Sequence, residues 1–444
     1  MEAHEKERTK APQSNKQTSF LEKPLKLMLV SSVLFISSLS FEFPIAFLPL
    51  YNRIRDIDPI WNGIFIGGSC LGVLLACLVT PSLMSTYPTR PLLTATAVAL
   101  GITTMLFALM DNLFEPIFYQ LVGTFSRSLS GALAGILEVI SFAGLVSVYP
   151  DNVGTTTAIG EAVLNGALAF GPFLGSILYH YGGLKKVFVI MGAIFSVSGI
   201  PAAFCPILSN AKADDEEEKG AAVKSSSCSV WDPWILFPFV HLTAIQVLNT
   251  FHYPIIAIYV ADFLGEDVVW TGSALLLNDV FICLSSPLWG ILIDKYNPYT
   301  ALVASSILMP ISYMLLGPLP LLSFIAPSKT QLLVALSIMG CIVPMGCIPA
   351  IPVAFDVYRN KNGNLPQWAS NALVSLYCSS FPLGGFIGST LAGFMDKNLS
   401  FRWSTGIISL VFLVHSLICC IYCSKVTRGR EDGIKKRLIE MESA

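Results

Sequence analysis

The sequence predicts an all-α membrane protein in which twelve transmembrane helices form two pseudo-symmetric bundles of six. Of the 444 residues, 54% are hydrophobic and only 13% are charged, which is about half the charged fraction of an ordinary soluble domain. Twelve apolar stretches are each long enough to cross the roughly 30 Å hydrocarbon core of a bilayer as a helix. In addition, a proline-containing pattern of the first half recurs in the second half.

The composition excludes several classes of protein. A net charge of −2 lacks the basic balance of a nucleic-acid-binding protein, and the hydrophobic content excludes a disordered scaffold. The sequence shows no nucleotide-binding loop, metal-ligand cluster or Ser/His/Asp arrangement, so we expect neither an enzyme nor a bound cofactor. Most of the eleven cysteines lie in apolar runs without zinc-ligand or redox spacing, and we interpret them as small buried residues.

The order of polar and apolar segments predicts the boundaries. Residues 1–26 form a polar, lysine-rich tail without the apolar region of a signal peptide. Residues 209–231 contain an acidic run and several serines, which is typical of a solvated linker between bundles at 27–208 and 232–424, with a tail at 425–444. The twelve expected spans are 27–50, 62–86, 91–110, 116–148, 154–181, 185–208, 233–261, 268–293, 299–322, 329–357, 367–396 and 403–424.

The basic residues predict the orientation of the chain. Of the 27 Lys and Arg residues, nineteen fall in the tails and loops of one predicted side and seven on the other, while Arg127 lies inside a span. Loops rich in Lys and Arg face the cytosol. We therefore expect both termini to be cytosolic.

The two halves contain proline-interrupted spans in the same register. Phe41–Ile45 in the first span reads FEFPI, and Phe251–Ile255 in the seventh span reads FHYPI, 210 residues later. Pro172 in the fifth span and Pro382 in the eleventh are separated by the same 210 residues. Parallel repeats of this kind occur in transporters whose binding site lies between two rocking bundles.

Three motifs resemble those of the major facilitator superfamily, and the likeness covers essentially all twelve spans. The fourth span contains Arg127-Ser-Leu-Ser-Gly131, similar to the Arg-centred motif of that helix. The fifth contains Gly171-Pro172-Phe173-Leu174-Gly175, similar to the Gly-Pro motif of the drug:proton antiporter group. The eighth ends in Gly290-Ile-Leu-Ile-Asp294-Lys295, which resembles the cytosolic gating-loop motif, whereas its first-half counterpart, residues 84–90, lacks the Gly and the Asp. The resemblance implies the major facilitator fold, with Gly171, Pro172, Gly175, Gly290 and Asp294 in hinge or gating positions.

Within this superfamily, the stretch 127–179 is most similar to the vesicular amine transporters. Residues 285–288 (SSPL) and 313–320 (YMLLGPLP) resemble the vesicular polyamine transporter branch in particular. The monoamine branch has carboxylates in the first and tenth spans, near positions 37–38 and 346–347 of this chain, which are Ser-Ser and Gly-Cys here. Monoamines are therefore disfavoured as substrates, and the resemblance implies proton-coupled antiport of an amine or polyamine, in a vesicle or another acidic organelle.

Ionisable side chains near the bilayer centre are candidate functional groups, because they are costly there unless they are paired or hydrated. Arg127 lies eleven residues into the fourth span and is expected to act as a counter-charge or proton-coupling partner, with a purely structural clamp between helices as the alternative. Glu138 follows about 16 Å further along nearly the same helical stripe, and Glu161 is expected at a similar depth on the fifth span. Two approaching carboxyls suit a proton carrier. The alternative is a solvated pair that faces the cytosolic opening.

Glu42 and His252 occupy equivalent positions in the repeats, each two residues before a proline. A proline within a span is tolerated where the helix lines a cavity or finds other donors, so we expect both side chains to face a central cleft. Glu42 would attract a cation and His252 would titrate. The alternatives are a residue at the helix end for Glu42 and a packed histidine for His252. Asp279 in the eighth span is a candidate for altered specificity.

The sequence therefore favours a secondary active transporter that exchanges protons for an organic cation, an amine or polyamine, by alternating access. Its expected partners are that small molecule, protons and the lipid bilayer; we expect no nucleic acid partner and a monomer. Two alternatives stay open: an exporter or facilitator of other small organic solutes, and a transport-inactive relative that acts as a membrane receptor or scaffold. A vesicle or other acidic-organelle membrane is expected, with the plasma membrane as the alternative.

Overall fold

The structure is a computed structural model that describes residues 14–112, 115–148, 153–201, 230–318, 320 and 327–442, which form helices and no β-strand. Residues 209–229 of the predicted linker and residues 1–13 of the predicted N-terminal tail lie outside the described residues. The side chain of Asp294, one of the predicted gating residues, also lies outside them.

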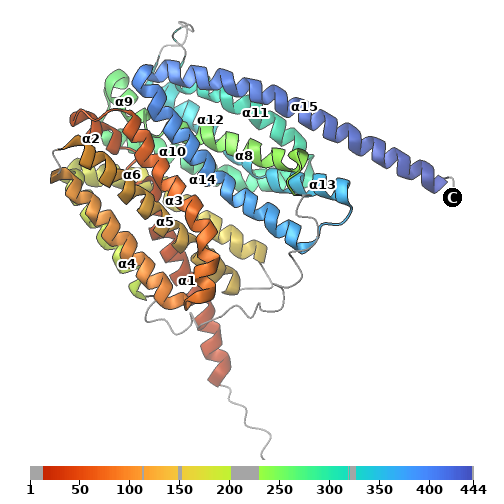
Figure 1. The fold of residues 1–444 in the computed structure, drawn as a ribbon, viewed down its shortest axis with the longest axis horizontal. Coiled ribbons are helices and arrows are strands. Elements are labelled where there is room, and N and C mark those ends of the chain that lie inside the picture. The colour runs from red at the N-terminus through yellow and green to blue at the C-terminus, as the bar shows by residue number, and fades with distance from the viewer. Residues whose placement is uncertain are drawn as a thin grey trace, which may run out of the picture.

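The first half of the chain forms one helical bundle (Figure 1). Its last long helix, α6, contains both the fifth and the sixth predicted spans, with a bend at Gly183 (φ 64°, ψ −178°), where the positive φ favours glycine. The elements are α1 (Ser14–Glu42), α2 (Leu48–Ile54), α3 (Ile60–Thr86), α4 (Thr89–Ala108), η1 (Leu109–Asn112), α5 (Pro116–Val148) and α6 (Val153–Ser198).

The second half forms the other bundle (Figure 1). Side-chain caps fix several helix starts: Asp232 accepts a hydrogen bond from the Trp234 N–H (2.8 Å), and Asp267 accepts one from the Trp270 N–H (2.9 Å). The last helix continues well beyond the predicted end of the twelfth span. The elements are α8 (Pro233–Phe251), α9 (Ile256–Tyr259), η4 (Val260–Leu264), α10 (Val268–Lys295), α11 (Pro298–Leu316), α12 (Lys329–Cys347), α13 (Ala350–Asn362), α14 (Gln367–Asn398) and α15 (Phe401–Glu442).

The predicted fold class is confirmed. Eleven helices of the described chain are long and apolar enough to cross a membrane by length and composition, and one of them, Ile159–Ser198, holds two predicted spans on either side of Gly183. The outer faces of the bundles are apolar: on α15, Val414, Leu417 and Ile421 are each more than half exposed. Such faces suit contact with lipid.

Three of the spans are broken at prolines. The first breaks between α1 and α2 at Pro44, and the seventh breaks between α8 and α9 at Pro254, so the sequence repeat marks equivalent interruptions. The tenth breaks between α12 and α13 beside Pro349. Proline has no N–H to give to the helix ladder, and each break leaves carbonyl groups that need another donor.

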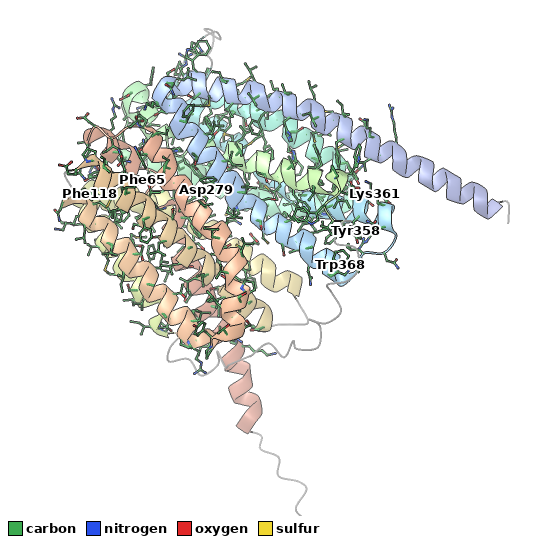
Figure 2. All side chains as sticks on the ribbon, in the orientation of Figure 1. Phe65, Phe118, Asp279, Tyr358, Lys361 and Trp368 are labelled. Carbon is green, nitrogen blue, oxygen red and sulfur yellow. The ribbon has the colours of Figure 1, made fainter. Side chains whose placement is uncertain are left out.

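Each bundle has its own hydrophobic core, to which the other contributes a few side chains: Ile45, Ala46 and Ile66 of the first half pack in the core of the second. The bundles meet along two seams, α3 against α14 and α6 against α10. Small residues allow the backbones to approach at these seams. A Cβ atom on Gly63 of α3 would overlap the Ser389 carbonyl oxygen of α14, and one on Gly272 of α10 would lie 2.8 Å from the Pro172 carbonyl oxygen of α6. Figure 2 shows that side chains otherwise fill each bundle.

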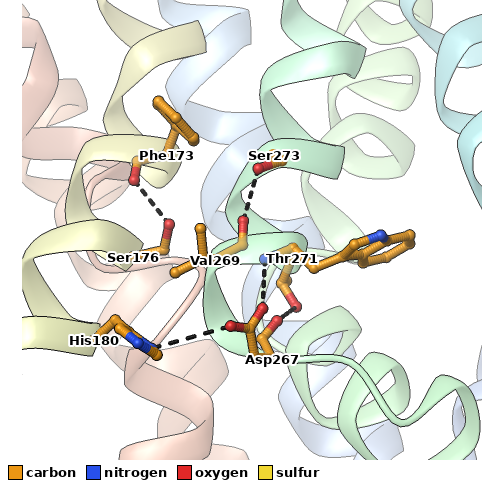
Figure 3. Close-up of polar contacts among 8 residues, drawn as sticks. Phe173, Ser176, His180, Asp267, Val269, Thr271 and Ser273 are labelled. Carbon is orange, nitrogen blue, oxygen red and sulfur yellow. Dashed lines mark hydrogen bonds and ion pairs between the residues drawn. The ribbon is translucent and has the colours of Figure 1, made fainter.

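Three ion pairs join the bundles at the end of the molecule that contains α2 and α9, which we call the closed end. Arg53 Nη1 lies 2.5 Å from Asp262 Oδ1, and Lys397 Nζ lies 2.5 Å from Asp58 Oδ2. The third pair, between His180 Nδ1 and Asp267 Oδ2 at 4.0 Å, is charged only when the imidazole is protonated (Figure 3). From this end the ribbons of the two bundles diverge towards α13 and the start of α1 (Figure 1).

Lys397→Gln is expected to loosen the closed end. The Lys397 ammonium lowers the pKa of the Asp58 carboxyl below its ordinary value, chiefly by a hydrogen bond. The pair therefore stabilises the closed end at any pH above the ordinary pKa of an aspartate. It is lost only as the pH falls through the lowered pKa of Asp58, so it persists at mildly acidic pH. Because both side chains are partly exposed, we expect hydrogen exchange at residues 51–62 to rise only about two- to fivefold.

The matched control is Lys361→Gln, since Lys361 Nζ forms an equally short 2.5 Å pair with Asp232 inside the second bundle. Hydrogen exchange measured by mass spectrometry should rise at residues 51–62 in the first variant and not in the second. Equal changes at the closed end in both variants would show that the Lys397 pair does not hold the bundles together.

Candidate functional site

The broken end of α1 lies against the Gly-Pro segment of α6. A Cβ atom on Gly175 would overlap the Phe43 carbonyl oxygen, and one on Gly171 would lie 3.2 Å from the Phe43 amide nitrogen. The same turn of α6 meets the second bundle, where Ser176 and Pro172 contact Gly272 of α10. Of the predicted hinge residues, Gly171 and Gly175 thus pack against the end of α1 within the first bundle, and Pro172 faces α10 of the second.

Arg127 supplies the donors that the break in α1 lacks. Pro44 has no N–H to give to the Ser40 carbonyl, and the Ile45 N–H donates to Glu42 O (3.0 Å) and not to Phe41 O. Arg127 Nη1 donates to Ser40 O and Nη2 to Phe41 O, each at 3.1 Å, and Nη2 also donates to Ser69 Oγ at 3.3 Å. The guanidinium is 2% exposed. Among the described residues no carboxylate forms an ion pair with it, so its contacts are those of the structural clamp.

Arg127→Lys is expected to lower the free energy of unfolding by about 1.5–3 kcal/mol, because an ammonium cannot reproduce the planar fork and leaves a buried carbonyl unpaired. Thermal unfolding of the purified protein in detergent would measure the loss. Arg428→Lys, at an exposed position of α15, is the control and should leave the melting temperature unchanged. Equal melting temperatures of all three proteins would contradict the clamp.

Glu42, the last residue of α1, reaches the second bundle. Its carboxyl hydrogen-bonds with the Tyr253 hydroxyl, and its charge interacts with that of Asp279 on α10. Asp279 is 5% exposed, and Asn278 Nδ2 donates to its Oδ1 at 2.9 Å. Figure 2 draws Asp279 where the two bundles meet. The structure thus brings together two of the predicted site residues, one from each bundle.

His252 lies inside its own bundle and does not meet Glu42. The ring is fully buried, and Nδ1 lies 3.1 Å from the Tyr313 hydroxyl on α11. Its Nε2 is buried without a hydrogen-bond partner. The repeat therefore places the backbone breaks equivalently but not the side chains that follow them, and the position of His252 is that of the packed alternative.

Glu138 and Glu161 form a second acidic pair further from the closed end. Their charges interact between α5 and α6, and both reach Cys378 of α14 in the other bundle. Glu161 and Cys378 are exposed to solvent and Glu138 is partly exposed. The two bundles thus approach each other at this depth through exposed side chains.

The remaining predicted gating position, Gly290 on α10, has open space around it: a Cβ atom there would meet nothing within 4 Å. Sequence reasoning missed Tyr253, although the repeat aligns it with Phe43, the residue before the other helix-breaking proline. Its aromatic position was visible in the sequence, but its hydroxyl contact depends on how the break after α8 meets the end of α1. Within the described residues no group of three or more His, Cys, Asp or Glu side chains could hold a metal ion.

A family model described as Major Facilitator Superfamily matches residues 116–365. The MFS-type transporter SLC18B1 of Homo sapiens is 27% identical over 373 residues, which cover 80% of this chain and 76% of the relative. The synaptic vesicular amine transporter of Mus musculus is 23% identical over 308 residues, covering 66% and 54% of the two chains. A crystal structure of a mutant of the nucleoside transporter NupG superposes with a TM-score of 0.68 at 12% identity, covering 89% of this chain and 99% of that one, which is a likeness of fold.

Proposed function

Because the chain belongs to the major facilitator superfamily and is a multi-pass membrane transporter, we propose that it exchanges protons for an organic cation, an amine or polyamine, by alternating access. The observation that supports this proposal is the meeting of Glu42 and Asp279 from opposite bundles at the seam. Arg127 lies close enough to interact electrostatically with Cys70, which is beside this pair. Its hydrogen bonds, however, go to backbone carbonyls and to Ser69. The seam is left acidic.

Two buried carboxyls that face each other cannot both stay ionised unless a cation compensates them. A proton on one of them and an ammonium group between them are alternative ways to supply that positive charge. Binding of the cation therefore favours release of the proton, and binding of the proton favours release of the cation. This competition is the coupling that an antiporter requires.

The arrangement of the bundles supports alternating access. At the closed end three ion pairs join the bundles, while Glu161 and Cys378 on the facing surfaces are exposed. Glu138 and Glu161 lie on the same route and would attract a cation towards the seam. We propose that this open side faces the cytosol together with both termini, and that the membrane is that of a vesicle or another acidic organelle.

The proposal that the substrate is an amine is supported by the relatives and by the acidic seam. One relative is named a synaptic vesicular amine transporter, and the chain has the polyamine-branch motifs at residues 285–288 and 313–320. The test is uptake of radiolabelled spermine, spermidine and a monoamine into proteoliposomes with an acidic interior. Uptake of a polyamine that stops when an uncoupler collapses the gradient is the expected result. No uptake of any amine by folded protein would exclude the amine and call for an unbiased screen of substrates.

A further inference from the structure

Tyr253 connects the two bundles at the acidic seam. It lies in the break between α8 and α9 and is 4% exposed. Its hydroxyl hydrogen-bonds with the Glu42 carboxyl of the other bundle, and the charge of Asp279 also reaches it. A phenol that is buried between two carboxyls can donate only one hydrogen bond. The Tyr253 hydroxyl therefore donates to one carboxyl and not to the other, so the two carboxyls are not equivalent.

The backbone of α6 and α10 places the side chains of Glu42 and Asp279 near one another. Gly171 of α6 brings the backbone close to Glu42, since a Cβ atom on it would lie 3.3 Å from Glu42 Cβ. On α10, Gly272 touches α6, and Asp279 follows seven residues later on nearly the same helical face. The face of α10 that contains Asp279 is therefore turned to the seam, where α1 ends.

The other titratable and charged groups nearby are Arg127, Cys70, His252, Tyr313 and Cys283, the last of which lies on α10 within electrostatic range of Asp279. Arg127 is bonded to the carbonyls of α1, and the His252 Nδ1 lies beside the Tyr313 hydroxyl at 3.1 Å. Cys70 on α3 lies within electrostatic range of both Glu42 and Arg127. Asn278 donates an amide hydrogen to Asp279, whereas Oε2 of Glu42 is buried without any partner. The carboxyl oxygen that still needs a hydrogen-bond donor is therefore Oε2 of Glu42.

We propose that Glu42 and Asp279 share one proton and that the Tyr253 hydroxyl positions it, so that a single proton-binding centre is divided between the two bundles. This inference rests on the proposed function and specifies its coupling site. When a cation enters between the carboxyls, the shared proton leaves to water on the open side, and one positive charge replaces another. Tyr253 keeps its own proton throughout and acts as a positioning residue. Separation of the bundles at the closed end would also separate the two carboxyls.

The test is infrared spectroscopy of the purified full-length protein without substrate, with the pH varied. A difference spectrum against the double variant Glu42→Gln/Asp279→Asn isolates the C=O stretch of the shared carboxyl from those of Glu138, Glu161 and Asp396. We expect one protonated carboxyl per protein, which titrates in one step. Glu42→Gln and Asp279→Asn should each displace the C=O band and shift the midpoint of this step, because the remaining carboxyl then titrates alone, without a partner with which to share the proton.

Tyr253→Phe retains the ring and removes the hydroxyl. It should displace the C=O band and move the midpoint to higher pH by about one unit, roughly a tenfold change in proton affinity, because the ionised carboxylate loses a donor. The matched control is Tyr259→Phe: Tyr259 is 3% exposed and stacked on Phe401 at 4.1 Å, and its loss should leave band and midpoint unchanged. Circular dichroism and size exclusion would establish that both variants are folded.

A Tyr253→Phe protein whose band and midpoint match those of Tyr259→Phe would overturn the positioning role. A band and midpoint that are both unchanged in Glu42→Gln would overturn the shared proton. These results are independent of substrate. If the infrared titration behaves as expected but no amine is taken up, the shared proton stands and the proposed substrate fails. If amine uptake is proton-coupled but Tyr253→Phe leaves the infrared titration unchanged, the proposed function stands and this inference fails.

Discussion

Glu42→Gln should abolish substrate-dependent proton flux while the protein remains folded. The substitution keeps the shape of the side chain and the acceptor for the Tyr253 hydroxyl, but it removes one of the two carboxyls that would exchange a proton for a cation. Asp279→Asn should have the same effect, since either change leaves a single carboxyl at the seam. Flux would be followed with a pH-sensitive dye trapped in proteoliposomes, after addition of spermidine.

Glu115→Gln is the matched control, because Glu115 is an exposed carboxylate at the start of α5, away from the seam. It should transport like the unmodified protein. Substrate-dependent flux that survives in Glu42→Gln would remove this carboxyl from the mechanism. If flux disappears in Glu115→Gln as well, the loss would reflect a general effect of surface charge and not the seam.

Gly175→Ala should destabilise the protein severely. The added Cβ atom would overlap the Phe43 carbonyl oxygen, which is backbone and cannot move aside as a flexible side chain could. Overpacking a well-filled interior costs typically 1–3 kcal/mol. At this position α6 is also confined on its other side by Gly272, so we expect a loss of about 3 kcal/mol or more in the free energy of unfolding, or failure to accumulate in the membrane.

Gly290→Ala provides the comparison, because this glycine is also within a long helix but has nothing within 4 Å of the added atom. Its stability should equal or slightly exceed that of the unmodified protein, since alanine has the higher helix propensity. Thermal unfolding in detergent and the yield of folded protein would measure both variants. Similar stabilities of the two variants would mean that α1 and α6 can move apart at little cost.

Much of the fold followed from local patterns in the sequence. The spans could be predicted from apolar length, because a bilayer dictates how many residues a helix needs to cross it. Pro44 and Pro254 marked the first and seventh breaks. The spans 154–181 and 185–208 were predicted as separate helices, and α6 contains two helices that meet at Gly183, where a single residue turns the chain.

The site was predicted less completely, for reasons that lie in the packing. The positions of Glu42 and Asp279 were visible as charges in apolar spans, but their meeting depends on how closely Gly272 approaches Pro172, which no periodicity encodes. His252 was expected at the cleft because it matches Glu42 in the repeat, yet its ring lies inside the second bundle, where it contacts the Tyr313 hydroxyl. The motif located Arg127, whereas its partners are carbonyls that become available only because α1 breaks at Pro44.

The glycine contacts along the seams have a consequence for the speed of movement. Where Gly63 and Gly393 or Gly272 and Pro172 meet, backbone lies on backbone. At these points the helices can slide or tilt without a side chain leaving its rotamer, so little friction opposes the rotation of one bundle over the other. The activation barrier then falls mainly on the ion pairs of the closed end, and the turnover rate should respond to ionic strength more than to membrane viscosity.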